Sequence, residues 1–289
     1  MNIKVFQKGF NYSQDGPGNR LVYHLQGCNM RCPWCANPES VNKNGMMMVN
    51  REWLTDSVCP YGAVRQKCID RTVCSICLKK PCIYVYKNKG IRYSCEGFEI
   101  EAIIDEVMRS SILFYEGGGV TLTGGEPTQQ FEAVELLLAA LKENGIHTAM
   151  ETNATHTELG SLFPLIDFLI MDFKHYDHDR HVRMTGIGNA LIKANIAKAL
   201  KTHKNVLIRI PLVKGFNSTV TDIEQFAAFF REQDMHNASF EFLPYHEYGK
   251  SKWLQCGMAY AMEDAFVGDE VLVLYEKIFK ENNLLVVRT

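Results

Sequence analysis

The sequence carries little net charge and has no long apolar run. Its 31 Lys and Arg residues nearly balance 33 Asp and Glu residues, so the formal net charge is −2. A chain this close to neutral has no bulk attraction to nucleic acid, and we expect no nucleic-acid partner. No stretch approaches the roughly twenty consecutive apolar residues that a membrane-spanning helix needs, so we expect no membrane partner either.

The first ten residues also lack the features of an export signal. They contain Lys4 and Lys8, but neither a long apolar core nor a small-residue cleavage site. We therefore expect a cytoplasmic protein whose cysteines stay reduced. The hydrophobic content of 46% and the charged content of 22% are ordinary for a globular protein, and no internal repeat is visible.

The sequence has ten cysteines, and they are unevenly distributed along the chain. Such a content without an export signal favours metal or redox chemistry over a disulfide framework. Cys28, Cys32 and Cys35 form a first group, and Cys256 stands alone. The second group comprises Cys59, Cys68, Cys74, Cys77, Cys82 and Cys95.

The first group has the spacing C-x3-C-x2-C and directly follows the apolar segment 21–27. Three thiolates on a loop that leaves a strand can hold three irons of a [4Fe-4S] cube. The fourth iron is then open to a small molecule, and chemistry would begin there. Zinc is the alternative on spacing alone, because His24 or another cysteine could supply the fourth ligand that zinc requires.

The cysteine loop resembles the signature of the radical S-adenosylmethionine (SAM) enzymes, and the resemblance spans nearly the whole chain. It is similar to the activating enzymes of glycyl-radical enzymes, the group that includes the pyruvate formate-lyase activator. The matching segments, in order, are DGPGNR (15–20), QGC (26–28), CPWCANPES (32–40), TGGEP (123–127), DFKH (172–175), RIP (209–211), GFN (215–217) and PYH (244–246). Two positions depart from the family pattern: Ala36 stands where histidine is usual, and Asn19 where an aliphatic residue is common.

From residue 98 onward, helical and strand patterns alternate. Helices are predicted at 99–109, 129–144, 157–163, 190–200, 221–233 and 270–281, and strands at 119–122, 146–150, 168–171, 205–211 and 239–243. The alternation predicts an α/β fold of βαβ units with a parallel sheet. About six units follow Leu21, too few for an eightfold barrel. The resemblance implies a partial (β/α)6 radical-SAM barrel, which we assign to residues 1–45 and 98–289.

Residues 46–97 have a different character, rich in Cys, Lys and Arg with little regular period. A segment this short and polar has little apolar core, so we expect an insert folded around metal. Related activators carry ferredoxin-like runs of four cysteines, and this insert departs from them. The resemblance implies one auxiliary cluster on Cys59, Cys74, Cys77 and Cys82, with Cys68 and Cys95 as alternative ligands. A zinc site on four of these six remains the competing interpretation.

Polar residues also follow the predicted strands, at the barrel end where functional groups gather. Gly124 and Gly125 would let backbone approach a ligand, although any strand-to-helix turn uses such residues. Asp172 and Lys174 share a face, as a ligand site or as an ordinary ion pair. Arg209 lies in an apolar strand, which is costly without an anionic ligand or an acidic partner such as Glu241.

The resemblance assigns these residues to SAM. It implies that the Gly124-Gly125 turn holds the amino group, with Glu126 near it. It also implies that Lys174 contacts the carboxylate, with Asp172 at the polar rim or on a bound cation. Glu151 and Thr152 match an acidic-threonine pattern of the family, with a helix cap from Thr152 or Asn153 as the alternative. The remaining expected SAM contacts are Trp34, Asn37, Arg209 and His246.

The function expected from the resemblance is reductive cleavage of SAM, followed by hydrogen abstraction from a glycine of a partner glycyl-radical enzyme. No catalytic acid or base is required, because the radical forms on the cofactor. The expected cofactors are the [4Fe-4S] cluster, SAM and one auxiliary cluster, and the expected electron donor is a flavodoxin or a ferredoxin. The alternatives are a radical SAM enzyme that acts directly on a peptide or small molecule, and a non-catalytic zinc or iron–sulfur module.

Overall fold

The computed structural model describes the chain except for residues 11–13, 56–58, 78, 85–86, 88 and 236. Its centre is a sheet that has eight strands in the described residues, in the order β12-β11-β10-β9-β8-β2-β1-β7. The strands are β1 (Asn2–Gly9), β2 (Arg20–Leu25), β7 (Glu96–Glu99), β8 (Gly119–Gly124), β9 (Thr148–Thr152), β10 (Phe168–Asp172), β11 (Val206–Leu212) and β12 (Ala238–Pro244).

The strands from β2 to β12 in this sheet are parallel, and they form the partial barrel that the sequence predicted. β1 pairs antiparallel with β2, and β7 pairs antiparallel with β1. These two antiparallel strands were not predicted. β7 has the sequence Glu-Gly-Phe-Glu, so it carries almost none of the apolar signal that marks a buried parallel strand.

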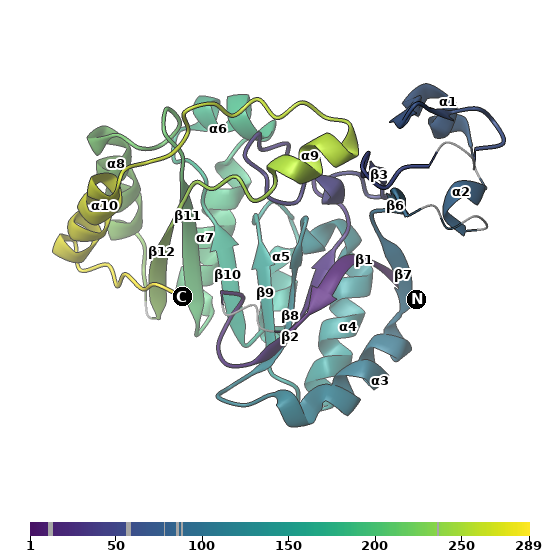
Figure 1. The fold of residues 1–289 in the computed structure, drawn as a ribbon. Coiled ribbons are helices and arrows are strands. Elements are labelled where there is room, and N and C mark those ends of the chain that lie inside the picture. Colours follow the sequence, from purple (N-terminus) through teal and green to yellow (C-terminus); the bar gives the residue numbers. More distant parts are fainter. Residues whose placement is uncertain (11–13, 56–58, 78, 85–86, 88, 236) are drawn as a thin grey trace.

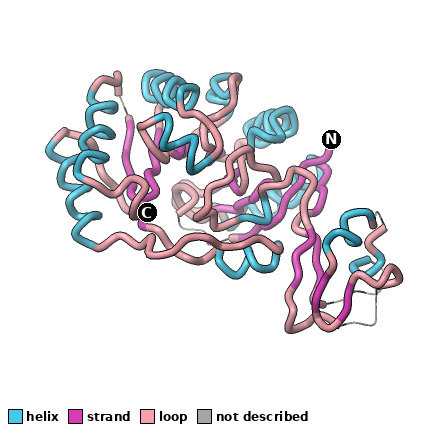
Figure 2. Tube along the Cα trace, turned by 90° about the horizontal axis from the view of Figure 1, so that it is seen from above, coloured by secondary structure: helices cyan, strands magenta, loops and turns pink. Residues whose placement is uncertain are grey.

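Helices cover the outer face of the sheet (Figures 1 and 2). They are α3 (Ile100–Ser110), α4 (Phe131–Glu143), α5 (Leu159–Leu162), α6 (His178–Thr185), α7 (Ala190–Thr202), α8 (Val220–Arg231) and α10 (Asp269–Glu281). Helix α9 (Lys250–Cys256) lies instead over the C-terminal ends of the strands. α6 and α9 were not predicted, because both are short and α6 has few apolar positions. The helix expected at 157–163 is shorter and continues as a 3-10 turn, Phe163–Leu165.

Helix α4 shows why the crossover helices form where they do. Val134, Leu137, Leu138 and Leu141 are completely buried, and their spacing places them on one helical face. Burying each such side chain contributes roughly 1.5–3 kcal/mol. The helix stops before Gly145, whose φ of +70° suits a left-handed turn.

A smaller part of the structure lies near the end of the sheet that β1 and β7 form, where Figure 2 shows it projecting from the barrel. Strand β3 (Met47–Val49) pairs with β6 (Ile91–Tyr93), and β4 (Val64–Arg65) pairs with β5 (Cys68–Ile69). Helices α1 (Arg71–Ile76) and α2 (Pro81–Tyr84) complete it. Its small apolar cluster consists of Met47, Val49, Leu54, Val64, Cys82 and Ile91.

The last residues of the chain run beside β12. Leu285 accepts from the Phe240 amide at 2.8 Å, and the Val287 amide donates back to Phe240 at 2.9 Å. This segment shields the outer edge of the barrel from solvent. In the described part of the chain, no helix is both long and apolar enough to cross a membrane.

Candidate functional site

A cavity of about 490 Å³ opens at the C-terminal ends of the parallel strands. The three cysteines of the C-x3-C-x2-C loop line it. The other predicted site residues on its wall are Trp34, Asn37, Gly124, Gly125, Glu151, Thr152, Asp172, Lys174 and His246. Segments from all along the chain therefore meet where a parallel barrel gathers its functional groups.

The cysteine loop begins directly after β2 and folds over the cavity. The Cys35 amide donates to Cys32 O at 3.1 Å, and the Asn37 amide donates to Cys35 Sγ at 3.3 Å. Burial raises the pKa of Cys32 to about 12 and also raises the pKa of Cys28 and Cys35. Thiolates enclosed in this way need a compensating positive charge, and metal binding provides one.

The donor set fits an iron–sulfur cube with one open corner, because three sulfurs face one cavity whose far wall is polar. No group of three or more His, Cys, Asp and Glu side chains in the described residues is arranged to hold a metal ion. This statement concerns single metal ions, and a cube of four irons is larger than a single ion.

The turn after β8 packs against the cysteine loop. Gly124 has a φ of +119°, and a Cβ at Gly125 would collide with the carbonyl oxygen of Gly27. The Gly125 amide donates to Leu25 O at 2.9 Å, and the Glu126 amide donates to Gly27 O at 2.7 Å. The glycines therefore allow the turn after β8 to approach the backbone of residues 25–27 closely. These contacts fix the position of the cysteine loop relative to the strands.

Glu126 lies beneath the cavity, outside its lining, and its side chain is fully buried. Its carboxylate accepts from the amide and hydroxyl of Thr128, the hydroxyl of Thr152 and the amide of Asn153. Burial raises the pKa of Glu126, although these hydrogen bonds oppose the change. The residue joins the ends of β8 and β9.

Arg209 is also buried behind the cavity wall, where it joins two acidic side chains. Its Nη1 donates to Glu151 at 2.7 Å, and its Nε donates to Glu241 at 2.9 Å. Thr123 donates to the second oxygen of Glu151 at 2.6 Å. Burial opposes ionisation of Glu151, but the Arg209 guanidinium holds the pKa of Glu151 below its usual value.

Asp172 and Lys174 form an ion pair of 2.9 Å on the cavity wall. Only 22% of the Asp172 side chain and 13% of the Lys174 side chain are exposed, so this is not an ordinary surface pair. Burial alone would lower the pKa of Lys174, but Asp172 raises it above its usual value. Lys174 is therefore a fixed positive charge beside the sulfurs.

The next residue, His175, lies away from the cavity and supports the loop after β10. It is fully buried, and its Nε2 lies 3.0 Å from Phe216 O. Burial lowers the pKa of His175 to about 4. The imidazole is therefore neutral at pH 7.

His246, Trp34 and Asn37 line the upper part of the cavity. The His246 ring stacks on Tyr248, with 4.2 Å between the ring centroids, and the Trp34 ring packs against Phe216 at 4.8 Å. Asn37 uses its side-chain oxygen to accept from Lys252 Nζ at 2.8 Å. The first two residues therefore bring aromatic rings to the cavity lining.

Several cavity residues were missed at the sequence level. Asp15 faces Glu151, and burial together with that carboxylate raises the pKa of Asp15 to about 7. The sequence could have pointed to Asp15, because this residue is the first of the DGPGNR segment that carries part of the family resemblance. Lys252 lies on α9 and Tyr248 lies just before it. Because this helix was not predicted, no sequence pattern pointed to either residue.

The second cysteine group is divided by the structure. Cys59, Cys74, Cys77 and Cys82 line one small cavity beside α1 and α2. The Ala63 amide donates to Cys59 Sγ at 3.2 Å. Burial and the three neighbouring sulfurs raise the pKa of Cys74 to about 11. Cys68 is exposed on β5, and Cys95 lines a separate shallow depression near β1.

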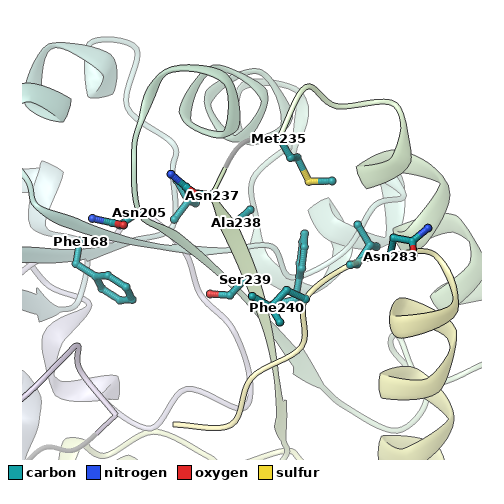
Figure 3. A pocket seen from close by; sticks show the side chains of 11 residues that line it. Phe168, Asn205, Met235, Asn237, Ala238, Ser239, Phe240 and Asn283 are labelled. Carbon is teal, nitrogen blue, oxygen red and sulfur yellow. The ribbon is translucent and has the colours of Figure 1, made fainter.

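A further cavity, of about 520 Å³, lies at the opposite end of the barrel (Figure 3). It is lined by residues at the N-terminal ends of β10, β11 and β12, among them Phe168, Asn205 and Ser239. None of the predicted site residues lies there, and this end of a parallel barrel serves stability rather than chemistry.

Comparison with known proteins agrees with this geometry. The family model described as "Radical SAM superfamily" matches residues 22–229, which is most of the chain. Fold similarity alone connects the chain to SuiB of Streptococcus suis, with a TM-score of 0.56 and 13% identity over 92% of this chain and 48% of that one. The fold and the cysteine loop thus define a radical SAM enzyme.

Relatives of known function identify the group of radical SAM enzymes to which the chain belongs. The 4-hydroxyphenylacetate decarboxylase activating enzyme of Clostridioides difficile (strain CD196) is 31% identical, over 93% of this chain and 90% of that protein. The choline trimethylamine-lyase activating enzyme of Oleidesulfovibrio alaskensis is 34% identical, over 86% of this chain and 85% of that protein. The chain belongs to the activating enzymes of glycyl-radical enzymes, within the radical SAM superfamily.

Proposed function

We propose that Cys28, Cys32 and Cys35 hold the [4Fe-4S] cluster of this activating enzyme and that SAM occupies the cavity beneath them. The observation that supports this most strongly is that the three sulfurs, the Gly124-Gly125 turn and the Asp172–Lys174 pair line one cavity. When bound, the cluster and SAM supply the radical chemistry by which a hydrogen atom is taken from a glycine of the partner enzyme.

The chain's own residues bind and orient in this proposal. Lys174 offers a fixed ammonium to the carboxylate of the ligand, and Asp172 keeps it in place. Glu151 and Thr152 present oxygen atoms from the end of β9, while His246 and Trp34 present rings to the adenosyl part. Glu126 and Arg209 act from behind the wall, by holding Thr152 and Glu151 in position.

The protein substrate in this proposal is a glycyl-radical enzyme. The relatives are named for a 4-hydroxyphenylacetate decarboxylase and a choline trimethylamine-lyase, and we propose a target of the same kind. Delivery of a low-potential electron requires a donor, and we propose a flavodoxin or ferredoxin in the cytoplasm.

For the insert, we propose that residues 46–97 form a separate unit around one auxiliary [4Fe-4S] cluster. The support is that Cys59, Cys74, Cys77 and Cys82 share one cavity, while Cys68 and Cys95 do not line it. Four thiolates from two sequence segments suit such a cluster. Zinc on the same four sulfurs is the competing outcome.

The test is metal analysis and EPR of the full chain, purified without oxygen. We expect iron and sulfide in the protein and a reduced-cluster signal that changes when SAM is added. Adding a candidate glycyl-radical enzyme should then produce a glycyl radical signal in that partner. Zinc without iron, or a cluster signal that ignores SAM, would overturn the proposal. A SAM-sensitive cluster that modifies a peptide or small molecule instead would assign a different radical SAM activity.

A further inference from the structure

Helix α9 lies against the far end of the cysteine loop. Trp253 Nε1 donates to Cys35 O at 2.9 Å, so the helix is tied to the backbone of a predicted ligand. Gly249, just before the helix, approaches so closely that a Cβ there would collide with Cys35 O and approach Ala36 Cα to 2.8 Å. Figure 1 shows α9 lying over the C-terminal ends of the strands.

Lys252 brings a positive charge to this contact. Its ammonium donates to Asn37 Oδ1 at 2.8 Å and forms an ion pair of 2.8 Å with Glu39 Oε1. The Asn37 amide in turn donates to Cys35 Sγ at 3.3 Å. Only 25% of the Lys252 side chain is exposed, and it lines the same cavity as the three sulfurs.

Glu39 is the buried half of this pair. It lies in the short 3-10 helix Pro38–Ser40 that ends the cysteine loop, and 2% of its side chain is exposed. Its second oxygen, Oε2, has no hydrogen-bond partner among the residues that the structure describes. Lys252 forms an ion pair with this carboxylate, so the two charges balance each other at the edge of the site.

Asn37 connects this charge pair to Cys35, since its side chain accepts from Lys252 and its amide donates to Cys35 Sγ, and the two charges have opposite signs. The positive charge of Lys252 favours negative charge on the sulfurs and on a cluster that they hold, whereas the negative charge of Glu39 disfavours it. A cluster gains one negative charge when it is reduced. A nearby cation therefore stabilises the reduced form, and a nearby anion destabilises it. Charges and hydrogen bonds around the sulfurs are the protein's means of setting a cluster potential.

We propose that Lys252 and Glu39 are positioning residues that set the reduction potential of the cluster on Cys28, Cys32 and Cys35. Lys252 raises this potential and Glu39 lowers it. The proposal rests on the cluster assignment made under the proposed function. It concerns how readily the cluster accepts an electron. Neither residue is placed among the groups that contact SAM.

The experiment is a redox titration of the full chain, reconstituted without oxygen and followed by the EPR signal that SAM perturbs. Lys252→Met removes the cation, and we expect a shift to more negative potential. Glu39→Gln removes the anion and keeps the shape, and we expect a shift to more positive potential. Lys252→Arg retains the charge and should restore a value near that of the unmodified protein.

Lys250→Met is the matched control. Lys250 lies on the same helix and also pairs with an acidic residue, but its side chain is 53% exposed and outside the cavity lining. The control removes the same charge, so a shift equal to that of Lys252→Met would overturn the proposal. Shifts of the same sign in Lys252→Met and Glu39→Gln would overturn it as well.

The variants also separate failure of this proposal from failure of the cluster assignment. If the unmodified protein shows no SAM-sensitive cluster signal, the proposed function is wrong. If it shows the signal but the potentials do not separate by charge, only the inference about Lys252 and Glu39 is wrong. Should Lys252→Met lose its cluster, Glu39→Gln still provides the opposite-signed test, because it keeps the lysine.

Discussion

Arg209 on β11 and Glu151 on β9 form a 2.7 Å ion pair across the intervening strand β10, and they lie 58 residues apart in the chain. Only 3% of the Arg209 side chain is exposed. The pair connects the interior of β11 to a residue at the cavity wall. Loss of this pair should therefore lower the free energy of unfolding and also disturb the position of Glu151 in the cavity wall.

Arg209→Met should destabilise the fold, because it leaves the buried Glu151 and Glu241 carboxylates without their cation. Breaking a buried pair from one side costs about 3–5 kcal/mol. Urea unfolding of the variant measures this loss. Lys214→Ala is the control, since its pair with Asp264 is exposed and contributes about 0–1 kcal/mol. Equal losses in the two variants would show that the Arg209 network does not stabilise the fold.

Cys32→Ala should abolish reductive cleavage of SAM, because one of the three proposed thiolate ligands is lost. The measurement is 5′-deoxyadenosine formed with dithionite under anaerobic conditions. Cys256→Ala is a matched control: this cysteine is also buried, but it lies outside the cavity lining and should leave product formation near the unmodified level. Product from Cys32→Ala at the control level would contradict the ligand assignment.

Cys82→Ala should remove the iron that the insert holds. A chain with two [4Fe-4S] clusters contains about eight irons, so loss of one leaves about four. Cys68→Ala, at an exposed cysteine outside the small cavity, should keep the full content. Iron and zinc are measured together, and zinc in place of the missing iron would assign the insert to the competing metal.

Gly125→Ala should disturb the cysteine loop, because the new Cβ would collide with the Gly27 carbonyl. Overpacking of this kind costs about 1–3 kcal/mol, and we expect the iron content to fall with stability. Gly97→Ala makes the same chemical change where the new Cβ meets only Asn2, at 3.9 Å. Thermal unfolding and iron analysis of both variants test whether the close approach matters.

His175 should make the fold less stable in mild acid. Burial lowers the pKa of His175 from 6.5 to about 4, so the unfolded chain binds a proton that the folded chain refuses. Its contribution is fully present above pH 6.5 and is lost progressively as the pH falls towards 4. His175→Asn should reduce the loss of unfolding free energy between pH 7 and pH 5. A residual slope is expected from His24, whose pKa burial also lowers to about 4. An unchanged slope in His175→Asn would contradict this assignment.

The sequence predicted the barrel because its parallel strands are continuous apolar runs that alternate with amphipathic helices. It predicted that the polar residues after those strands would gather at one end of the barrel, and they line one cavity there. It could not reveal that Glu126 turns away from the cavity, since it is enclosed by groups of Thr152 and Asn153, at and just beyond the end of β9. Contacts between α9 and the cysteine loop join residues 215 positions apart, and no local pattern encodes such a pairing.

The attachment of α9 has a practical consequence for anyone who wishes to simplify the protein. Arg71, in the small cysteine-bearing part, donates to Gln255 O at 2.7 Å and to Met47 O at 2.9 Å. The same helix supports the cysteine loop, through the hydrogen bond from Trp253 Nε1 to Cys35 O. Deleting residues 46–97 to obtain a minimal barrel would therefore remove a contact of α9, the helix that supports the cysteine loop. We expect the shortened protein to represent the cysteine loop of the intact protein poorly.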